Sequence, residues 1–179
     1  MGAFDMATPP LVRPAVLDGP DALGVSALLA DYHSQTESEK SAHGLAEAGD
    51  LPQRYSAEVR DPAAALAHGE ILVAEQEGEL VGMVVLHRTG DDVEIKRLWV
   101  AAAHRRSGVG GALMADVVTR SAAKGAAGLR LSVWDWRVAA VELYRTQGFV
   151  DAPSWESRER LVCLRRPCPA GSARDDRSA

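Results

Sequence analysis

The stretch LWVAAAHRRSGVGGALM, residues 98–114, decides the fold class of this 179-residue chain. Its apolar start predicts the end of a strand, and the apolar series from Val109 onward predicts one face of a helix. Between them, Arg105-x-x-Gly108-x-Gly110 forms a loop at the helix N-terminus. Glycine lets the backbone approach a ligand closely, and the unpaired N–H groups of a first helical turn attract anions. The stretch therefore predicts a pyrophosphate-binding loop.

Two other interpretations of this loop are weaker. A dinucleotide-binding fingerprint, G-x-G-x-x-G, needs a third glycine, but counted from Gly108 that position holds Leu113. The loop also follows several expected strands rather than the first one. Glycines that serve only tight helix packing are the simpler alternative, but the adjacent strand and the neighbouring arginines favour an anion site.

Outward from the loop, the hydrophobic pattern alternates between strands and helices, which is typical of a mixed α/β fold. Turn residues at Glu77-Gly78 and Gly90-Asp91 predict a hairpin-rich first half, and Asp61-Pro62 predicts a helix start. Gly148 predicts a helix end onto which Phe149 packs. We expect strands at residues 11–16, 71–75, 80–87, 93–100, 129–133 and 155–164, helices at 20–32, 109–124 and 138–147, and one or two short helices between 33 and 68.

Composition and charge limit the function classes. The chain is 46% hydrophobic, which is enough to form a globular core. Its formal net charge of −5 argues against nucleic acid or an anionic membrane as a partner, since binding to either needs clustered Lys and Arg. We expect a loose leader at residues 1–10, a single domain at residues 11–166 and a disordered tail at residues 167–179. With no signal-peptide pattern, a cytoplasmic location is expected. Cys163 and Cys168 lack metal-ligand spacing, so no metal site is expected. Because Cys168 lies in a Pro-rich tail, no disulfide is expected either.

Arg105-x-x-Gly108-x-Gly110 resembles the acyl-CoA pyrophosphate motif of the GNAT acetyltransferases. EIKRLWV at residues 94–100 is similar to the strand that enters this loop in that family, and LYRTQGF at residues 143–149 resembles the family's second signature, LYxxxGF. The resemblance covers roughly residues 71–164. It implies the GNAT fold, a mostly antiparallel twisted sheet of about six to seven strands flanked by about four helices.

The resemblance also implies a co-substrate, acetyl-CoA, and no metal. In this family the strand ending at Val100 would splay from the strand at residues 129–133, and the pantetheine arm would lie in the gap. An N–H near Leu98 would hold the acetyl carbonyl oxygen as negative charge develops on it. The residues expected to bind the co-substrate are Leu98, Trp99, Val100, Arg105, Arg106, Ser107, Gly108, Val109 and Gly110.

Two catalytic residues follow from the same resemblance. Tyr144 is the candidate general acid for the departing CoA thiolate, and Glu94 is the candidate base that takes the amine proton through water. The alternatives are that Tyr144 only packs its helix on the sheet and that Glu94 only pairs with Lys96 or Arg97. Arg137 stands where family members often have Asn, so any contact of that Asn is not expected here.

The acceptor side is less defined. Trp134, Asp135 and Trp136 could line the acceptor pocket, with Asp135 pairing a cation, or could be ordinary core and rim residues. In the front segment we expect solvated helix surface at His33, Glu37, Glu39 and His43.

An N-acetyltransferase acting on the amine of a small cationic molecule is the leading function. A protein lysine or N-terminal acetyltransferase and a non-catalytic acyl-CoA-binding sensor are alternatives. An acetylating toxin acting on charged tRNA is disfavoured by the net charge of −5. A homodimer is a further expectation, because dimers are common in the family.

Overall fold

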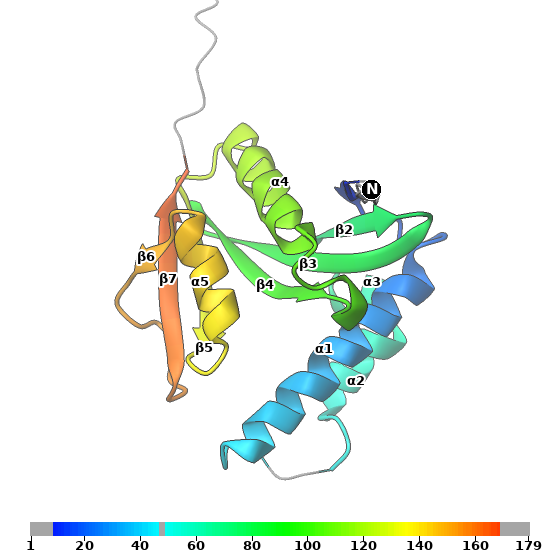
Figure 1. Cartoon of the computed structure of the whole chain (residues 1–179), viewed down its shortest axis with the longest axis horizontal. Coiled ribbons are helices and arrows are strands. Elements are labelled where there is room, and N and C mark those ends of the chain that lie inside the picture. The colour runs from blue at the N-terminus through cyan, green and yellow to red at the C-terminus, as the bar shows by residue number, and fades with distance from the viewer. Residues whose placement is uncertain (1–8, 47–48, 169–179) are drawn as a thin grey trace, which may run out of the picture. The chain divides into compact units, whose positions relative to one another are not determined.

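A computed structural model describes residues 9–46 and 49–168 of the chain (Figure 1). The seven strands form a sheet in the order β1-β2-β3-β4-β5-β7-β6, which confirms the expected mixed α/β fold with a mostly antiparallel sheet. The described residues contain five α-helices, within the four or five expected. The elements are β1 Leu11–Pro14, α1 Ala22–Ala42, α2 Gln53–Arg60, α3 Pro62–Ala65, β2 Glu70–Gln76, β3 Glu79–Thr89, β4 Asp92–Val100, the 3₁₀ turn Ala102–His104, α4 Val109–Ala123, β5 Gly128–Trp134, α5 Val138–Thr146, β6 Val150–Asp151 and β7 Leu161–Pro167.

The described residues fall into two compact units. Unit 1 contains the chain up to His87 together with Lys96–Leu113, and unit 2 contains Arg88–Ile95 together with the chain from Met114 onward. Strands β3 and β4 and helix α4 each contribute to both units. That residues 11–166 behave as a single domain stays a prediction.

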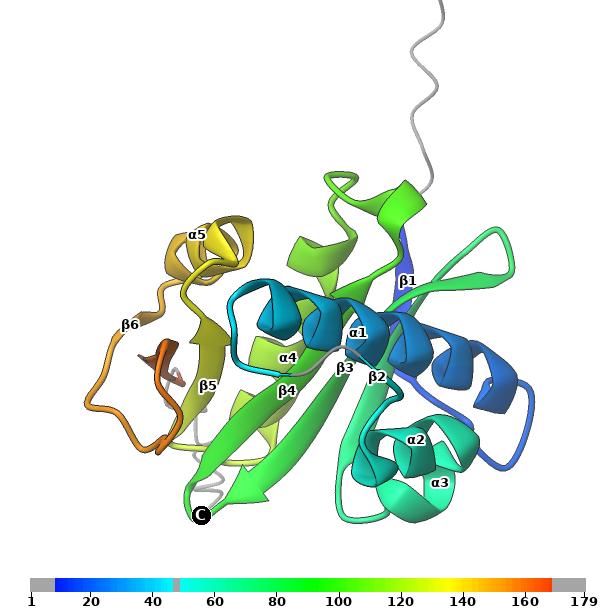
Figure 2. The same ribbon diagram turned by 90° about the horizontal axis from the view of Figure 1, so that it is seen from below.

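In unit 1, strands β1, β2 and β3 pair antiparallel, and helix α1 crosses one face of them (Figure 2). Between β2 and β3, Glu77 and Gly78 both have positive φ angles, 52° and 84°. Two such residues make the hairpin turn whose twist suits paired strands, as expected from the sequence. The core on the α1 face consists of Val25, Leu28 and Leu29 of α1, Leu66 beyond α3, and Ile71, Val73, Met83, Val85 and Trp99 of the sheet.

The opposite face of unit 1 receives the first turn of α4. At Gly82 of β3, an added Cβ would lie 3.0 Å from the carbonyl oxygen of Trp99 and 3.0 Å from Cγ1 of Val109. Such distances are too short for a side chain without movement of its neighbours. Glycine at this position therefore allows α4 to begin directly on the sheet.

Unit 2 is built on β5, which pairs antiparallel with β7 along its whole length. The start of β4 pairs parallel with β5 over three residues, from Asp92 opposite Gly128 to Glu94 opposite Arg130. Helix α5 ends as expected: Gly148 has φ 86°, the N–H of Phe149 donates to the carbonyl of Tyr144 at 3.1 Å, and Phe149 is buried.

The predicted end of the first helix at residue 32 was wrong, because α1 continues to Ala42. The buried positions Val25, Leu29, His33 and Thr36 keep helical spacing past that point. His33 and Thr36 are polar, so the apolar periodicity in the sequence ends at Leu29 although the buried face of α1 continues to Thr36.

The final strand was also predicted too early, because β7 begins at Leu161 rather than at residue 155. The preceding polar residues form a turn in which Arg160 has φ 68° and its carbonyl accepts from the N–H of Asp135 at 3.0 Å. At the other end, Pro167 closes β7 and the N–H of Cys168 donates to the carbonyl of Ala127 at 3.0 Å. The rest of the expected tail and most of the expected leader lie outside the described residues.

An ion pair between Arg13 of β1 and Asp21 joins the first strand of unit 1 to the start of α1. Asp21, 3% exposed, accepts hydrogen bonds from both terminal nitrogens of Arg13, at 2.6 and 2.9 Å, and from the N–H of Val16 at 2.7 Å. Arg13 also reaches Glu75 of β2 at 2.7 Å. The hydrogen bonds from Arg13 hold the pKa of Asp21 below its ordinary value, although burial opposes this.

Because the folded-state pKa of Asp21 is depressed, its contribution to stability is present above the unfolded carboxyl pKa, about 3.9, and is lost as pH falls through the folded value. We expect Asp21→Asn to lower the free energy of unfolding by about 2–3 kcal/mol at pH 7. The difference from wild type should shrink at pH 3. Urea unfolding at both pH values measures this, and the exposed pair of Asp151 with Arg145 supplies the control, since Asp151→Asn should cost under about 1 kcal/mol.

Candidate functional site

The predicted anion-binding loop lies entirely within unit 1, between β4 and α4. The 3₁₀ turn is closed by the hydroxyl of Ser107, which donates to the carbonyl of His104 at 2.6 Å. Arg106 and Gly108 then take positive φ angles of 62° and 90°. The first hydrogen bond of α4 runs from the N–H of Ala112 to the carbonyl of Gly108 at 2.9 Å. The N–H groups of residues 109–111 precede this bond, so helix geometry leaves them without intrahelical acceptors.

The space beside Gly108 suits a phosphate group. A Cβ built on Gly108 would have no heavy atom within 4 Å, so the backbone there faces open space. The positive φ is a conformation that favours glycine. Together with the dipole of a 15-residue helix, the loop presents backbone donors and partial positive charge to a ligand. These residues fit an anionic group such as a pyrophosphate.

The two arginines of the loop have different surroundings. The guanidinium of Arg105 lies 4.6 Å from the ring centre of Trp99, donates to the carbonyl of Val100 at 3.2 Å and to Oε1 of Gln35 at 3.0 Å. It thereby joins the loop to the end of β4 and to α1. Arg106 is exposed. Arg105 is exposed as well, but its contacts hold it against the end of β4 and α1.

The side chain of Trp99 belongs to the core rather than to a ligand surface. It is 8% exposed and meets the ring of Tyr32 edge-on, with centroids 5.8 Å apart. Its Nε1 is buried without a hydrogen-bond partner among the described residues. Any contact of Trp99 with the co-substrate would therefore come from its backbone.

A buried ionic cluster in unit 1 was missed by the sequence analysis. His33, expected on solvated surface, is 1% exposed, and its Nε2 lies 2.8 Å from Oε2 of Glu58 on α2. Arg97 of β4 donates to both carboxylate oxygens of Glu58, from Nε at 2.6 Å and from Nη2 at 2.5 Å. Arg97 has φ 51°, a left-handed conformation that costs a non-glycine residue about 1–2 kcal/mol.

The spacing of His33 four residues after Leu29, on the buried face of α1, was the only signal for this cluster. Glu58 lies in a short helix of mostly polar residues, and nothing in its own sequence marks it as the buried one. Of the other front-segment residues, Glu37 pairs with Lys40 within α1 at 2.8 Å, and His43 is exposed beyond its end.

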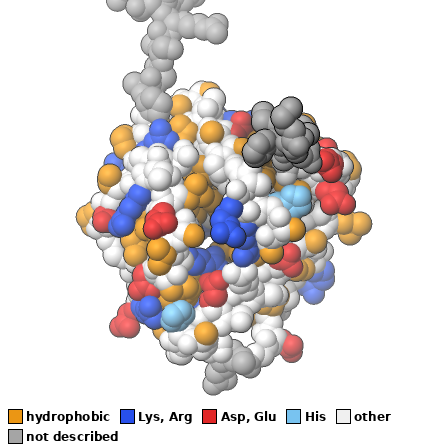
Figure 3. Space-filling view, viewed as in Figure 1, with side chains coloured by type: hydrophobic (Ala, Val, Ile, Leu, Met, Phe, Trp, Pro, Cys, Tyr) orange, Lys and Arg blue, Asp and Glu red, His pale blue; other side chains and the backbone are white. Residues whose placement is uncertain are grey.

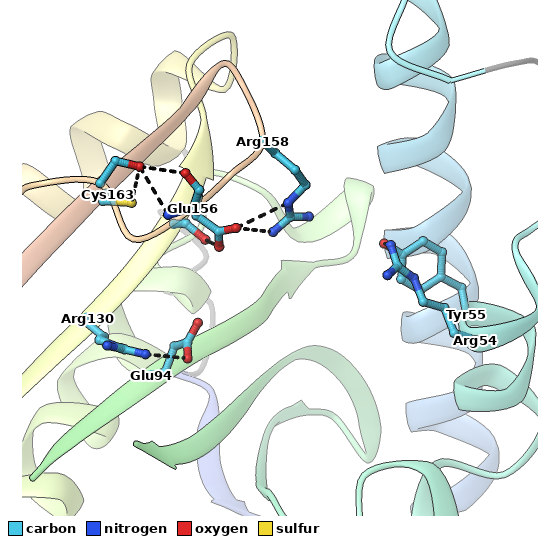
Figure 4. Close-up of polar contacts among 9 residues, drawn as sticks. Arg54, Tyr55, Glu94, Arg130, Glu156, Arg158 and Cys163 are labelled. Carbon is cyan, nitrogen blue, oxygen red and sulfur yellow. Dashed lines mark hydrogen bonds and ion pairs between the residues drawn. The ribbon is translucent and has the colours of Figure 1, made fainter. Parts of the chain in front are cut away.

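In unit 2, the candidate base Glu94 is ion-paired. Its Oε2 lies 3.3 Å from Nη2 of Arg130 (Figure 4). The hydroxyl of Thr89 donates to the same oxygen at 3.4 Å. The Glu94 side chain is 12% exposed. Arg130 also stacks on the ring of Trp155, 5.0 Å from its centre. This ion pair keeps the Glu94 carboxylate oriented.

The candidate acid Tyr144 is buried in unit 2, 7% exposed, with its ring 5.9 Å from that of Phe149. This packing agrees with a structural role and also with a positioned acid. Its part in proton transfer stays a prediction.

The candidate acceptor residues form a stacked set at the end of β5. The rings of Trp134 and Trp136 lie 4.7 Å apart and nearly parallel, at 10°. Asp135 is held by Arg160, with oxygen to nitrogen distances of 2.9 and 3.1 Å. Because Arg160 already balances its charge, an acceptor cation would have to compete with this arginine for Asp135.

Glu156 is a further carboxylate that the sequence analysis did not single out. It accepts from Oγ of Ser132 at 2.7 Å and from Nη2 of Arg158 at 2.8 Å (Figure 4).

On the face drawn in Figure 3, acidic and basic side chains are interspersed. Among residues 9–46 and 49–168, no group of three or more His, Cys, Asp or Glu side chains is arranged to hold a metal ion, and no helix is long and apolar enough to cross a membrane.

Comparisons with known proteins point to one family. The sequence profile of the Acetyltransferase (GNAT) family matches residues 29–149. Thialysine N-epsilon-acetyltransferase from Sus scrofa is 32% identical over 72 residues, an alignment that spans 38% of this chain and 42% of that protein.

Two similar solved structures share the fold. The phosphinothricin acetyltransferase of Sinorhizobium meliloti, in complex with AcCoA, superposes with a TM-score of 0.63 at 18% identity, over 93% of this chain and 92% of that one. The ribosomal-protein-S18-alanine N-acetyltransferase of Escherichia coli gives 0.60 at 19% identity, over 89% and 94% of the two chains.

The loop geometry predicts the effect of a side chain at Gly108. Gly108→Val should raise the Kd for CoA by about tenfold or more, because the new side chain fills the space beside the N–H groups and strains a positive φ. Calorimetry with CoA measures this. Gly44, beyond α1, also has a positive φ, 71°, and open space, so Gly44→Val imposes the same strain away from the loop and should bind CoA normally. Equal affinities of the two variants would contradict the assignment.

Proposed function

The chain belongs to the GNAT family of acetyltransferases and is an acetyl-CoA-dependent acyltransferase, and we propose that its acceptor is the amine of a small cationic molecule. The observation that carries the acetyl-CoA half of this proposal is the glycine loop that opens α4. Two facts support a cationic acceptor. The net charge of −5 favours cations, and the name of the Sus scrofa relative specifies the ε-amine of thialysine.

In this proposal the backbone of residues 105–110 and the start of α4 bind the pyrophosphate, with Arg106 adding charge. Arg105 keeps the loop docked on Trp99 and α1 through the contacts it makes in the free protein. The backbone of Leu98 and Val100 holds the pantetheine arm, and the N–H of Leu98 donates to the acetyl carbonyl oxygen. Such a donor is worth roughly 10²–10³ in rate, because it stabilises the oxygen as its negative charge grows.

The acceptor nitrogen attacks the thioester carbon, a C–N bond forms and the C–S bond breaks. An alkyl amine has a pKa of about 10.4 and is protonated at neutral pH, so it must lose a proton before it can attack. Glu94 accepts that proton through water. Tyr144 gives its hydroxyl proton to the departing thiolate, whose conjugate acid is a thiol with a pKa near that of tyrosine. The second proton that the nitrogen loses as the amide forms passes through solvent and restores the Tyr144 hydroxyl.

An acceptor screen tests the proposal. The protein is incubated with acetyl-CoA and, in separate reactions, with small cationic amines, a lysine-containing peptide and a peptide with a free N-terminus. Release of free thiol gives the rate, and mass spectrometry identifies the product. Acetylation of a small amine at the highest kcat/KM is the expected result. Preference for either peptide would replace the acceptor, and CoA binding without acetyl transfer to any of them would favour a sensor.

Removal of one hydroxyl tests Tyr144. Tyr144→Phe keeps the buried ring and its packing on Phe149 but removes the proton donor. We expect kcat to fall by roughly 10²-fold while the Kd for acetyl-CoA stays unchanged. Rates measured in a single turnover isolate the chemical step. A wild-type rate in that measurement would limit Tyr144 to packing.

A pH series tests Glu94. Glu94→Gln should lower kcat/KM by roughly 10²-fold at neutral pH, and the loss should shrink as pH rises, because the amine then deprotonates without help. Glu79→Gln, at an exposed position of β3, removes the same charge away from β5 and serves as the control. If Glu94 only attracts the cationic acceptor, KM should rise with kcat unchanged, and added salt should reproduce the effect in wild type.

A further inference from the structure

Glu58 joins three elements of unit 1 through one buried carboxylate. From α2 it contacts His33 of α1 at 2.8 Å and receives both arms of the Arg97 guanidinium from β4, at 2.6 and 2.5 Å. The side chains of Glu58 and Arg97 are only 10% and 17% exposed. A two-point contact of this kind fixes the plane of the guanidinium as well as its position.

The far side of the cluster is also held in place. The ring of His33 stacks on Tyr55 of α2 with centroids 4.3 Å apart, and meets Tyr32 edge-on at 5.1 Å. Burial raises the pKa of Glu58, but the hydrogen bonds from His33 and Arg97 outweigh it, and the pKa lies below its ordinary value. The carboxylate is therefore charged at neutral pH, with fixed partners on two sides.

Arg97 needs such support because its backbone is left-handed, with φ 51°, inside a strand. A non-glycine residue keeps this conformation only where its surroundings hold it there. The next peptide group carries the N–H of Leu98. Its direction depends on the backbone of Arg97, since the two residues share that peptide plane.

We propose that Glu58 is a positioning residue for acetyl transfer: by holding Arg97 in its left-handed conformation, it aims the N–H of Leu98 at the acetyl carbonyl oxygen. This rests on the proposed function, in which Leu98 supplies that donor. Glu58 itself touches neither substrate. Its carboxylate acts on the reaction only through the backbone of β4.

Glycine at position 97 separates this role from a merely structural one. Glu58→Ala should lower kcat by roughly 10²-fold, as for loss of one carbonyl donor, with little change in the KM for acetyl-CoA. Glu58→Ala combined with Arg97→Gly should recover most of that loss, because glycine adopts the left-handed conformation without a partner. Glu58→Ala combined with Arg97→Ala should recover none. The two double variants differ only in the backbone freedom of residue 97.

Asp21→Asn is the matched control, since it breaks another buried ion pair of unit 1 away from β4. Assayed well below its Tm, it should keep the wild-type kcat. A wild-type kcat in folded Glu58→Ala, or equal rates in the two double variants, would overturn the proposal.

A second measurement does not depend on turnover. The probe is a CoA analogue with a methylene between the sulfur and the acetyl carbonyl, so it keeps the carbonyl oxygen but cannot transfer the acetyl group. In ¹⁵N-labelled protein, the amide resonance of Leu98 should shift when this analogue binds. The shift should be lost in Glu58→Ala and return in the glycine double variant. If wild type transfers acetyl groups yet the Leu98 resonance responds equally in all variants, the proposed function stands and the role of Glu58 falls. If wild type transfers to no amine, the proposed function falls, and the same resonance still decides whether Glu58 orients Leu98.

Discussion

The close approach of α4 to the sheet at Gly82 is the constraint on which the candidate site depends. Because a side chain there would lie 3.0 Å from the carbonyl oxygen of Trp99 and 3.0 Å from Cγ1 of Val109, glycine lets α4 start directly over β3 without displacing these neighbours. The loop before α4 lies next to this contact. Its N–H donors are presented within a few residues of the end of β4, where the proposed mechanism needs them.

Two ion pairs with a buried carboxylate fix backbone segments of unit 1 relative to one another. The Asp21–Arg13 pair joins the segment before α1 to the first strand, and Arg13 continues to β2. The Glu58–Arg97 pair does the same for α2 and β4. A buried ion pair adds little net stability, since desolvation offsets the attraction, but it specifies one arrangement of its partners. In β4 that arrangement includes a left-handed residue just before the proposed carbonyl donor.

Unit 2 places the two proposed proton-transfer groups differently. Tyr144 is buried by packing of α5, whereas Glu94 is oriented by Arg130 on the neighbouring strand. The proposed mechanism therefore requires that an amine and its water reach Glu94 without displacing Arg130. The rate of transfer then depends on the geometry of this pair as well as on the carboxylate.

The sequence by itself determined the glycine loop, the hairpin turn at Gly78, the helix end at Gly148 and the order of the elements apart from the short strand β6. Glycines and apolar periods act locally, so the sequence shows them directly. It did not reveal the buried face of α1 beyond Tyr32, the late start of β7 or the Glu58 cluster. The buried face of α1 and the Glu58 cluster depend on polar side chains with distant partners, because both His33 and Arg97 contact Glu58. The turn before β7 depends on a backbone hydrogen bond between Asp135 and Arg160. From sequence alone, a polar side chain is predicted to be exposed to solvent. Only the tertiary structure decides whether it is solvated or buried against a hydrogen-bond partner.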